Sequence, residues 1–190
     1  MTRQILGISA AALIIAATTA AGQAPTPDRA RLDRIQQNLT GTVPHVLCLD
    51  ANFTTGGQPI DDAYAKAAIN GFRSVVSQRT STEGIDLVRK RARVESTKMR
   101  FFNIPVSGST PRPEQADEFL RLTRDKTNHP KLINCASDLR VRAFMMILRV
   151  VDLGWSEETA LEETVKIGLN NKGLKKFAKE HIAQQKAKRA

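Results

Sequence analysis

The chain has 190 residues, which is enough for one domain with a well-buried core and too few for two domains of ordinary size. Its 29 lysine and arginine residues outnumber 19 aspartate and glutamate residues, which gives a formal net charge of +10. Only two cysteines are present, so the composition excludes a small scaffold held together by disulfides. We therefore expect a single basic domain.

The first 24 residues have the pattern of a secretory signal peptide. Arg3 precedes an apolar run over residues 5–17, and small residues continue to Ala24. Cleavage after Ala21 and cleavage after Ala24 both fit this pattern, and an uncleaved N-terminal anchor is the alternative. The apolar run is shorter than an ordinary membrane span. We expect an exported chain, periplasmic or secreted, without stable membrane insertion after cleavage.

A spacer and a charged helix are expected over residues 25–43, with the helix at 28–39 and outside the core. Apolar spacing and turn residues then predict the first elements of the main domain. These are strands at 46–49 and 52–55, a helix at 61–70 and a strand at 72–77. The breaks between them fall at Gly56-Gly57-Gln58-Pro59 and at Gly71.

The second half of the chain continues the alternation. Thr80-x-x-Glu83 has the spacing of a capping box, which predicts a helix over residues 83–96. The elements that follow are a strand at 100–106, a helix at 113–126, a strand at 131–134 and helices at 140–153 and 156–167. The main domain thus covers residues 44–170, and residues 171–190 form a basic C-terminal helix or tail.

Short connections between alternating strands and helices predict an α/β fold, with a mostly parallel central sheet of four or five strands flanked by helices. In such sheets ligands bind beyond the carboxyl ends of the strands. Three segments fall at that edge, namely Gly57 with Gln58, Gln78 with Arg79, and the segment after Cys135. We therefore expect these segments to meet.

The strand at 131–134 runs directly into Cys135, and Arg140 follows five positions later at the start of a helix. A cysteine is a strong nucleophile only as the thiolate, and backbone N–H groups at a helix N-terminus favour that form. The same N–H groups can hold an anionic substrate, and the planar guanidinium of Arg140 can bind two oxygens of a phosphoryl or sulfuryl group. The alternative is that Cys135 is an ordinary buried cysteine at a strand end.

Four segments carry a resemblance to a known family. They are Phe53-Thr-Thr-Gly-Gly-Gln-Pro59, Asn70-Gly-Phe-Arg-Ser-Val-Val76 with Arg79, Asn103-Ile-Pro-Val106 and Asn134-Cys-Ala-Ser137. Together they resemble the bacterial beta-lactamase-hydrolase-like phosphatase family, which is related to the dual-specificity phosphatases and has some members described as sulfurtransferases. The resemblance covers about residues 48–169.

The resemblance implies a cysteine-phosphatase-like fold and a cysteine-dependent phosphatase that hydrolyses phosphomonoesters through a cysteinyl-phosphate. Cys135 is then the nucleophile, and Arg140 binds the transition state. Loop and pocket residues are expected to bind the phosphate: Ala136, Ser137, Asp138, Leu139, Gln58 and Arg79. No cofactor or metal is needed, and the expected substrate is a phosphorylated small molecule or a phosphoprotein.

Asp138 departs from the pattern of the family, whose loop usually reads Cys-Ala-Ser-Gly-Asn-Arg. A carboxylate directed into the loop would repel phosphate, whereas one that points outward or pairs with Arg142 would leave the loop usable. A phosphatase of this kind also needs a general acid, and the loop at 107–110 contains no carboxylate. Three carboxylates elsewhere are candidates: Asp50, Glu114 and Asp117.

Two alternatives to a phosphatase stay open. A rhodanese-like sulfurtransferase that forms a persulfide on Cys135 is favoured by the Cys-x4-Arg spacing, which is one residue shorter than the usual Cys-x5-Arg of phosphatases. A catalytically inactive anion-binding module is favoured by Asp138 and by the missing general acid.

Seven basic residues and one acidic residue lie from Lys172 onward. Phe177 is the one aromatic residue in this segment, whereas a nucleic-acid site would need several interleaved with the charges, so we interpret the basic residues as a solvated helix face and expect no nucleic-acid partner. Binding of a polyanion is the alternative. The three histidines lack metal-ligand spacing. Cys48 is expected to pack in an apolar run, and a disulfide with Cys135 is the alternative.

Overall fold

The computed structural model describes residues 27–189, so the predicted signal peptide lies outside the described residues. At its centre is one five-stranded sheet with the spatial order β1-β2-β5-β3-β4. The strands are β1 (Leu47–Cys48), β2 (Phe53–Gly56), β3 (Ser74–Ser77), β4 (Arg100–Asn103) and β5 (Lys131–Asn134). β1 is antiparallel to β2, and the other three neighbouring pairs are parallel. The prediction of a mostly parallel sheet is confirmed.

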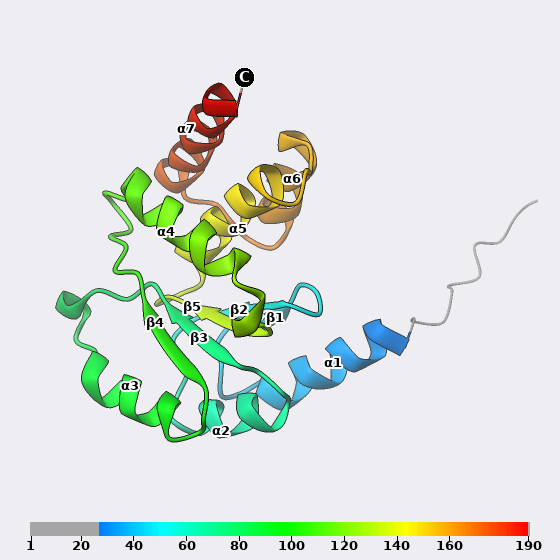
Figure 1. Ribbon diagram of the computed structural model, residues 1–190, viewed down its shortest axis with the longest axis vertical. Helices are drawn as coiled ribbons and strands as arrows, with labels where there is room; N and C mark the ends of the chain where they lie inside the picture. Colours follow the sequence, from blue (N-terminus) through cyan, green and yellow to red (C-terminus); the bar gives the residue numbers. More distant parts are fainter. Residues whose placement is uncertain (1–26, 190) are drawn as a thin grey trace, which may run out of the picture.

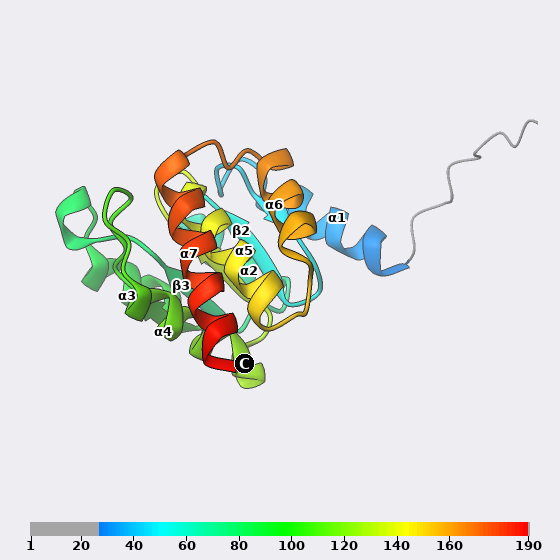
Figure 2. The same ribbon diagram turned by 90° about the horizontal axis from the view of Figure 1, so that it is seen from above.

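Helices cover both faces of this sheet (Figure 1). The helices of one face are α1 (Pro27–Leu39), α2 (Asp62–Ile69) and α3 (Leu87–Glu95). Those of the other face are α4 (Pro113–Arg124), α5 (Leu139–Val151), α6 (Glu157–Lys166) and α7 (Lys172–Arg189). Seen from above, α5 lies between α6 and α7 and packs against both (Figure 2).

Two apolar clusters fill the space on either side of the sheet. Neighbouring strand residues point to opposite faces, so Val75 joins the cluster under α1–α3 and Val76 joins the cluster under α4–α7. α5 is buried almost all round, and Phe144 and Met146 have no exposed surface. The loop that precedes α5 is therefore attached to the most deeply buried helix of the domain.

α1 packs onto the sheet, and the prediction that it lies outside the core is wrong. Ile35 and Leu39 are one helical turn apart, and both are buried against the α1–α3 side of the sheet. Gln36 Oε1 also accepts a hydrogen bond from Cys48 N at 2.9 Å. Two apolar residues at this spacing are enough to bury one stripe of an otherwise polar helix.

The helix predicted at 83–96 begins later, and the predicted capping box does not form. Ser81–Glu83 is a 3-10 turn, and Gly84 follows it with a φ of 68°. α3 begins after Asp86, whose side chain accepts a hydrogen bond from Arg89 N at 2.8 Å. A left-handed glycine ends a helix, so the turn at Glu83 cannot continue into α3. The Glu83 side chain is thus directed elsewhere.

α7 contributes to the core on one side and to the basic surface on the other. Leu174, Phe177 and Ile182 are buried in the α4–α7 cluster. The lysines of α7 are exposed, apart from the half-buried Lys175, as the interpretation of a solvated face predicts. None of the helices within residues 27–189 is long and apolar enough to cross a membrane.

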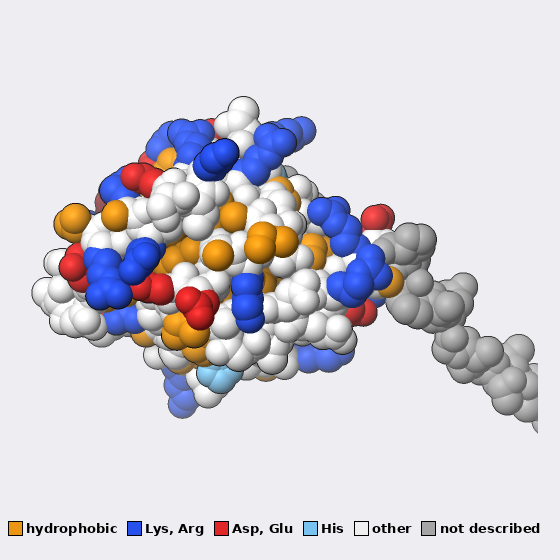
Figure 3. Space-filling view, turned by 90° about the horizontal axis from the view of Figure 1, so that it is seen from below, with side chains coloured by type: hydrophobic (Ala, Val, Ile, Leu, Met, Phe, Trp, Pro, Cys, Tyr) orange, Lys and Arg blue, Asp and Glu red, His pale blue; other side chains and the backbone are white. Residues whose placement is uncertain are grey.

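The face formed by α1–α3 carries apolar side chains over its middle, with lysine and arginine side chains around them (Figure 3). Three large aliphatic side chains of the α2 and α3 region are exposed: Ile60, Ile69 and Val88. Scattered exposed aliphatics of this kind are common on protein surfaces. We assign them no function.

Candidate active site

The carboxyl ends of β2, β3 and β5 bring the three predicted segments together. Gln58 N donates a hydrogen bond to Ala136 O at 3.0 Å. Gln78 N donates to Asn134 O at 2.7 Å. These bonds join the segments that follow β2 and β3 to the end of β5, which Cys135 directly follows. The site predicted at this edge of the sheet is therefore assembled from adjacent parallel strands.

Gly57 allows the segment after β2 to approach the cysteine loop closely. A Cβ at Gly57 would lie 3.0 Å from Ala136 O and 3.1 Å from Pro44 Cβ. Both distances are shorter than ordinary contacts, and one of the atoms belongs to the backbone of the loop. Any larger residue at position 57 would push this segment away from the loop. The second glycine of the Gly-Gly-Gln-Pro motif is thus explained by packing at the site.

The loop that follows Cys135 presents a row of unpaired backbone N–H groups. None of the N–H groups of residues 136–141 has a hydrogen-bond acceptor within residues 27–189. The first that finds one belongs to Arg142, which donates to Asp138 O at 3.0 Å. α5 begins at Leu139, so the positive end of its dipole lies at the same place. Such a row of donors at a helix N-terminus is suited to bind an anion.

Arg140 is 6% exposed, and its guanidinium is fixed by several acceptors. Nη1 donates to Gln78 O at 3.0 Å and to Val106 O. Nη1 and Nη2 pair with the two carboxylate oxygens of Glu83 at 2.6 and 3.0 Å. Burial lowers the pKa of Arg140, but Glu83 and the sulfur of Cys135 raise it above its usual value. The guanidinium is therefore charged and lies beside the thiol.

Glu83 is a site residue that the capping-box interpretation missed. Besides Arg140 it contacts Arg79, which forms an ion pair with its carboxylate and donates from Nη2 to Glu83 O at 2.8 Å. Burial alone would raise the pKa of Glu83, but the two arginines lower it below its usual range. Glu83 is thus ionised at neutral pH and orients Arg140.

An open cleft of about 440 Å³ lies over the loop. The residues that line it are Glu83, Gly108, Ser109, Ser137, Leu139, Arg140, Asn171, Gly173 and Leu174. Cys135 is 1% exposed and is not part of this lining, so its side chain lies beneath the surface of the cleft. Gln58 and Arg79 also lie outside the lining. Their contact with a phosphate stays a prediction.

Residues 30–190 match the family model described as a DSP-PTPase phosphatase fused to NAD+ kinase. The chain belongs to this DSP-PTPase family. The resemblance to dual-specificity and tyrosine phosphatases is thereby confirmed, and the chain is a hydrolase of this type. No curated protein matches it.

Solved structures resemble this DSP-PTPase in fold. The DUF442 protein of Shewanella putrefaciens CN-32 is 15% identical, over 78% of this chain and 97% of its own, with a TM-score of 0.68. Tk-PTP in its active form is 20% identical, over 74% of this chain and 97% of its own, with a TM-score of 0.64. P. aeruginosa TpbA is 18% identical, over 76% of this chain and 91% of its own, with a TM-score of 0.60. The cysteine-phosphatase-like fold is confirmed.

Asp138 of this DSP-PTPase has a backbone conformation that favours glycine, the residue that the resemblance leads us to expect at this position. Its φ is 72°, in the left-handed region that aspartate tolerates better than most residues. The side chain is fully buried, with Oδ2 accepting a hydrogen bond from Arg142 Nε at 2.9 Å and Oδ1 without a partner within residues 27–189. Burial raises the pKa of Asp138 to about 6, although Arg142 lowers it. The carboxylate thus pairs with Arg142, which is the arrangement that leaves the loop usable.

Gly168 makes room for this ion pair. A Cβ at Gly168 would collide with Arg142 Nη1, and the φ of 102° at this position also favours glycine. The guanidinium of Arg142 therefore packs directly over the backbone that follows α6. Three positions, Asp138, Arg142 and Gly168, act together to hold a negative charge next to an anion site.

We expect Asp138→Asn to change the pH dependence of hydrolysis. Asp138 becomes negative as the pH rises through about 6, and its charge then opposes an anionic substrate. The ratio of kcat/KM of Asp138→Asn to that of the wild type should be near one below about pH 5 and rise about threefold to tenfold above about pH 7. Steady-state assays with an aryl phosphate measure this ratio, in which the titrations common to both proteins cancel.

Asp138→Gly is the matched second variant, because it removes the charge together with the side chain at positive φ. It should show the same rise in the ratio. A ratio that does not vary with pH would contradict the expectation and show that Arg142 neutralises the carboxylate fully.

None of the three candidate general acids lies in the cleft of this DSP-PTPase. Asp50 precedes β2, at the opposite edge of the sheet, and accepts a hydrogen bond from Arg149 at 3.0 Å. Asp117 lies in α4, 3.3 Å from His181 Nε2. Glu114 is exposed in the first turn of α4. Glu83 is the one carboxylate residue in the lining.

The two cysteines of this DSP-PTPase are free. β2 lies between β1 and β5, so Cys48 and Cys135 are at least two strand spacings apart, which is about 10 Å and beyond the reach of a disulfide. Cys48 is buried, and its sulfur accepts a hydrogen bond from Thr54 Oγ1 at 3.2 Å. Within residues 27–189, no cluster of three or more His, Cys, Asp and Glu residues is placed to hold a metal ion.

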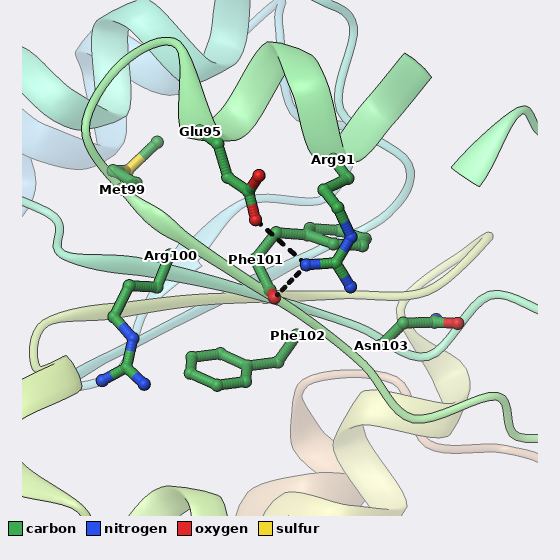
Figure 4. A pocket seen from close by; sticks show the side chains of 7 residues that line it. All are labelled: Arg91, Glu95, Met99, Arg100, Phe101, Phe102 and Asn103. Atoms are coloured by element: carbon green, nitrogen blue, oxygen red, sulfur yellow. Dashed lines mark hydrogen bonds and ion pairs between the residues drawn. The ribbon is translucent and has the colours of Figure 1, made fainter. Parts of the chain in front are cut away.

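A second hollow, of about 590 Å³, follows the edge strand β4 of this DSP-PTPase (Figure 4). Arg91 Nη1 donates to Glu95 Oε1 at 3.0 Å and to Phe101 O at 3.3 Å. The Arg91 side chain thus satisfies a backbone carbonyl of the edge strand, which helps to keep this edge from pairing with a strand of another chain. No predicted site residue lines this hollow, so we assign the chemistry to the cleft over the cysteine loop.

Proposed function

We propose that Cys135 attacks the phosphorus of a phosphomonoester and that the reaction passes through a cysteinyl-phosphate. The observation that carries this proposal is the row of unpaired N–H groups at residues 136–141, directly after Cys135 and beside Arg140. In the first step an S–P bond forms and the ester O–P bond breaks, so the leaving oxygen takes the electron pair. In the second step water attacks the phosphorus, and phosphate and the thiolate are released.

The lining of the cleft supports aryl phosphates as the substrate class. Glu83 is the one carboxylate residue in that lining, and two arginines keep it ionised. A leaving oxygen that needs a proton in order to depart therefore finds no acid there. A phenolate departs with less help than an alkoxide. A cysteine-to-serine variant of P. aeruginosa TpbA has been solved with pTyr bound, and the substrate proposed here is likewise a small aryl phosphate or a phosphotyrosine in a protein.

Export is part of the proposal. It is supported by residues 1–24, which precede the domain and have a basic residue near the start, then an apolar run, then small residues. The phosphatase would then act in the periplasm or outside the cell. N-terminal sequencing of the chain recovered from that fraction checks this, because a chain that stays in the cytoplasm and retains Met1 would contradict it.

Acid quenching during turnover of an aryl phosphate, followed by mass analysis of the peptides, tests the proposed reaction. We expect one phosphoryl group on the peptide that contains Cys135, and much less after incubation with an alkyl phosphate at the same concentration. Incubation with thiosulfate should leave that peptide without an added sulfur atom.

Each contrary result has a defined meaning. A persulfide from thiosulfate, with no phosphoryl adduct, would replace the proposal by the sulfurtransferase, which the short Cys-x4-Arg spacing favours. Tight phosphate binding without any adduct or turnover would replace it by the inactive anion-binding module. Equal labelling by the alkyl phosphate would contradict the substrate class while leaving the nucleophile in place.

A further inference from the structure

Lys90 is a buried lysine directly behind the loop that carries Cys135. It is 4% exposed and lies in α3, and the ring of Phe101 lies 5.9 Å from its Nζ. Nζ donates to Ser77 Oγ at 2.9 Å, to Asn134 Oδ1 at 3.1 Å and to Gln58 Oε1 at 3.3 Å. These acceptors belong to the ends of β3 and β5 and to the segment after β2, which are the three segments that form the site.

The surroundings of Lys90 contain no carboxylate partner. Its three hydrogen-bond acceptors are neutral oxygens, which is unusual because buried lysines are normally paired with an anion. The pKa of Lys90 is lowered to about 7, mainly by burial and also by the positive charge of Arg79. Cys135 is the one ionisable group, among residues 27–189, that raises it. The ionisable groups that act on Lys90 are thus the guanidinium of Arg79, which repels its positive charge, and the thiol of Cys135.

Asn134 links the lysine to the cysteine in space. Its Oδ1 accepts a hydrogen bond from Lys90, and its Nδ2 donates to Cys135 O at 3.2 Å. The ammonium of Lys90 and the backbone of Cys135 therefore contact the same fully buried side chain, and the thiol of Cys135 is close enough to raise the pKa of Lys90. In such a low-dielectric place a positive charge on one group favours a negative charge on the other.

We propose that Lys90 is a positioning residue whose buried positive charge favours the thiolate form of Cys135. The inference rests on the proposed function only in that the proposed reaction uses this thiolate. It adds a second cation to the site, on the side of the loop opposite to the open cleft. The unpaired backbone N–H groups of the loop then remain available for the substrate, because part of the thiolate charge is balanced by Lys90.

The test follows alkylation of Cys135 by iodoacetamide as a function of pH, in a Cys48→Ser background so that one thiol is observed. In Lys90→Met we expect the midpoint of the alkylation profile to move up by about one pH unit, with about fivefold to tenfold slower alkylation at neutral pH. Lys131→Met is the matched control. Lys131 is also fully buried and donates to a neutral oxygen, Asp125 O, at 2.9 Å, but it lies at the other end of β5. Its profile should match that of the parent.

An unchanged profile in Lys90→Met would overturn the inference, and so would an equal shift in Lys131→Met, which would indicate a general loosening of the fold. If Lys90→Met does not give a native circular dichroism spectrum, Lys90→Gln replaces it with the same expectation. The assay does not need turnover. A parent protein that alkylates at neutral pH but hydrolyses no phosphate would contradict the proposed function and leave the role of Lys90 intact.

Discussion

Replacement of Cys135 by serine is expected to lower kcat/KM for an aryl phosphate by at least about a thousandfold. A serine hydroxyl in the same place is far less nucleophilic than a thiolate, and nothing in the site is placed to take its proton, because Glu83 is held by two arginines. Serine has nearly the volume of cysteine, so the packing around the loop should be preserved. Steady-state kinetics and a circular dichroism spectrum of the variant measure both parts of the expectation.

Cys48→Ser is the control for this variant. Cys48 is also buried and free, but it lies on the edge strand β1, two strands from β5. Its kcat/KM should stay within about twofold of the wild type, since surface and core residues outside the site affect catalysis only through the fold. Unchanged turnover in Cys135→Ser would remove Cys135 from the mechanism. A similar loss in both variants would indicate unfolding.

The place of the site could be predicted from the sequence because it depends on where parallel strands end. The strands that end near Gly57, Gln78 and Cys135 are recognisable from short apolar runs followed by turn residues. In a parallel sheet these ends share one edge, so the three segments meet without any knowledge of the strand order. The order β1-β2-β5-β3-β4 itself depends on packing between helices that are distant in sequence.

Glu83 could not be assigned from its spacing alone. A glutamate three residues after Thr80 fits a capping box, and the same glutamate can equally form an ion pair with a distant arginine. The start of α3 is set by Gly84, which has a positive φ and ends the preceding turn, and by Asp86, which caps α3 in place of Thr80. The Glu83 side chain is then available to Arg140, a contact over 57 positions that no local pattern encodes.

The burial of Lys90 could have been predicted from its spacing in the sequence. Lys90 lies three residues after Leu87 and four before Val94, so the three share one helix face, and Val94 and Lys90 are both buried. A lysine at an apolar position of a helix otherwise rich in exposed arginine is a candidate for a buried charge. What the pattern cannot give is the partner, because Ser77 and Asn134 come from other strands.

The Asp138–Arg142 pair shows a different limit. The spacing of four residues on a helix start makes an ion pair an expected option, and the structure forms it. The role of Gly168 could not be predicted, since it depends on the path of the chain after α6, which passes over the guanidinium of Arg142.

Arg140→Lys is expected to lower kcat/KM by about a hundredfold to a thousandfold. The guanidinium of Arg140 donates at the same time to both carboxylate oxygens of Glu83 and to two backbone carbonyls, and it lies beside Cys135. A lysine ammonium is a single point charge on a flexible stem and cannot keep this orientation. The loss should fall mainly on kcat, because Arg140 binds the oxygens of the phosphoryl group more tightly in the transition state than in the bound substrate.

Glu83→Gln separates the orientation of Arg140 from its charge. Glutamine keeps the size of the side chain but removes the ionic part of the contact, so we expect a smaller loss of about tenfold in kcat/KM. If Glu83 acts only through Arg140, then adding Glu83→Gln to Arg140→Lys should cost nothing further, and the double-mutant cycle will be strongly non-additive. Additive losses would mean that Glu83 acts on the substrate directly, and the carboxylate in the cleft would then have to be reconsidered as the source of the proton for the leaving oxygen.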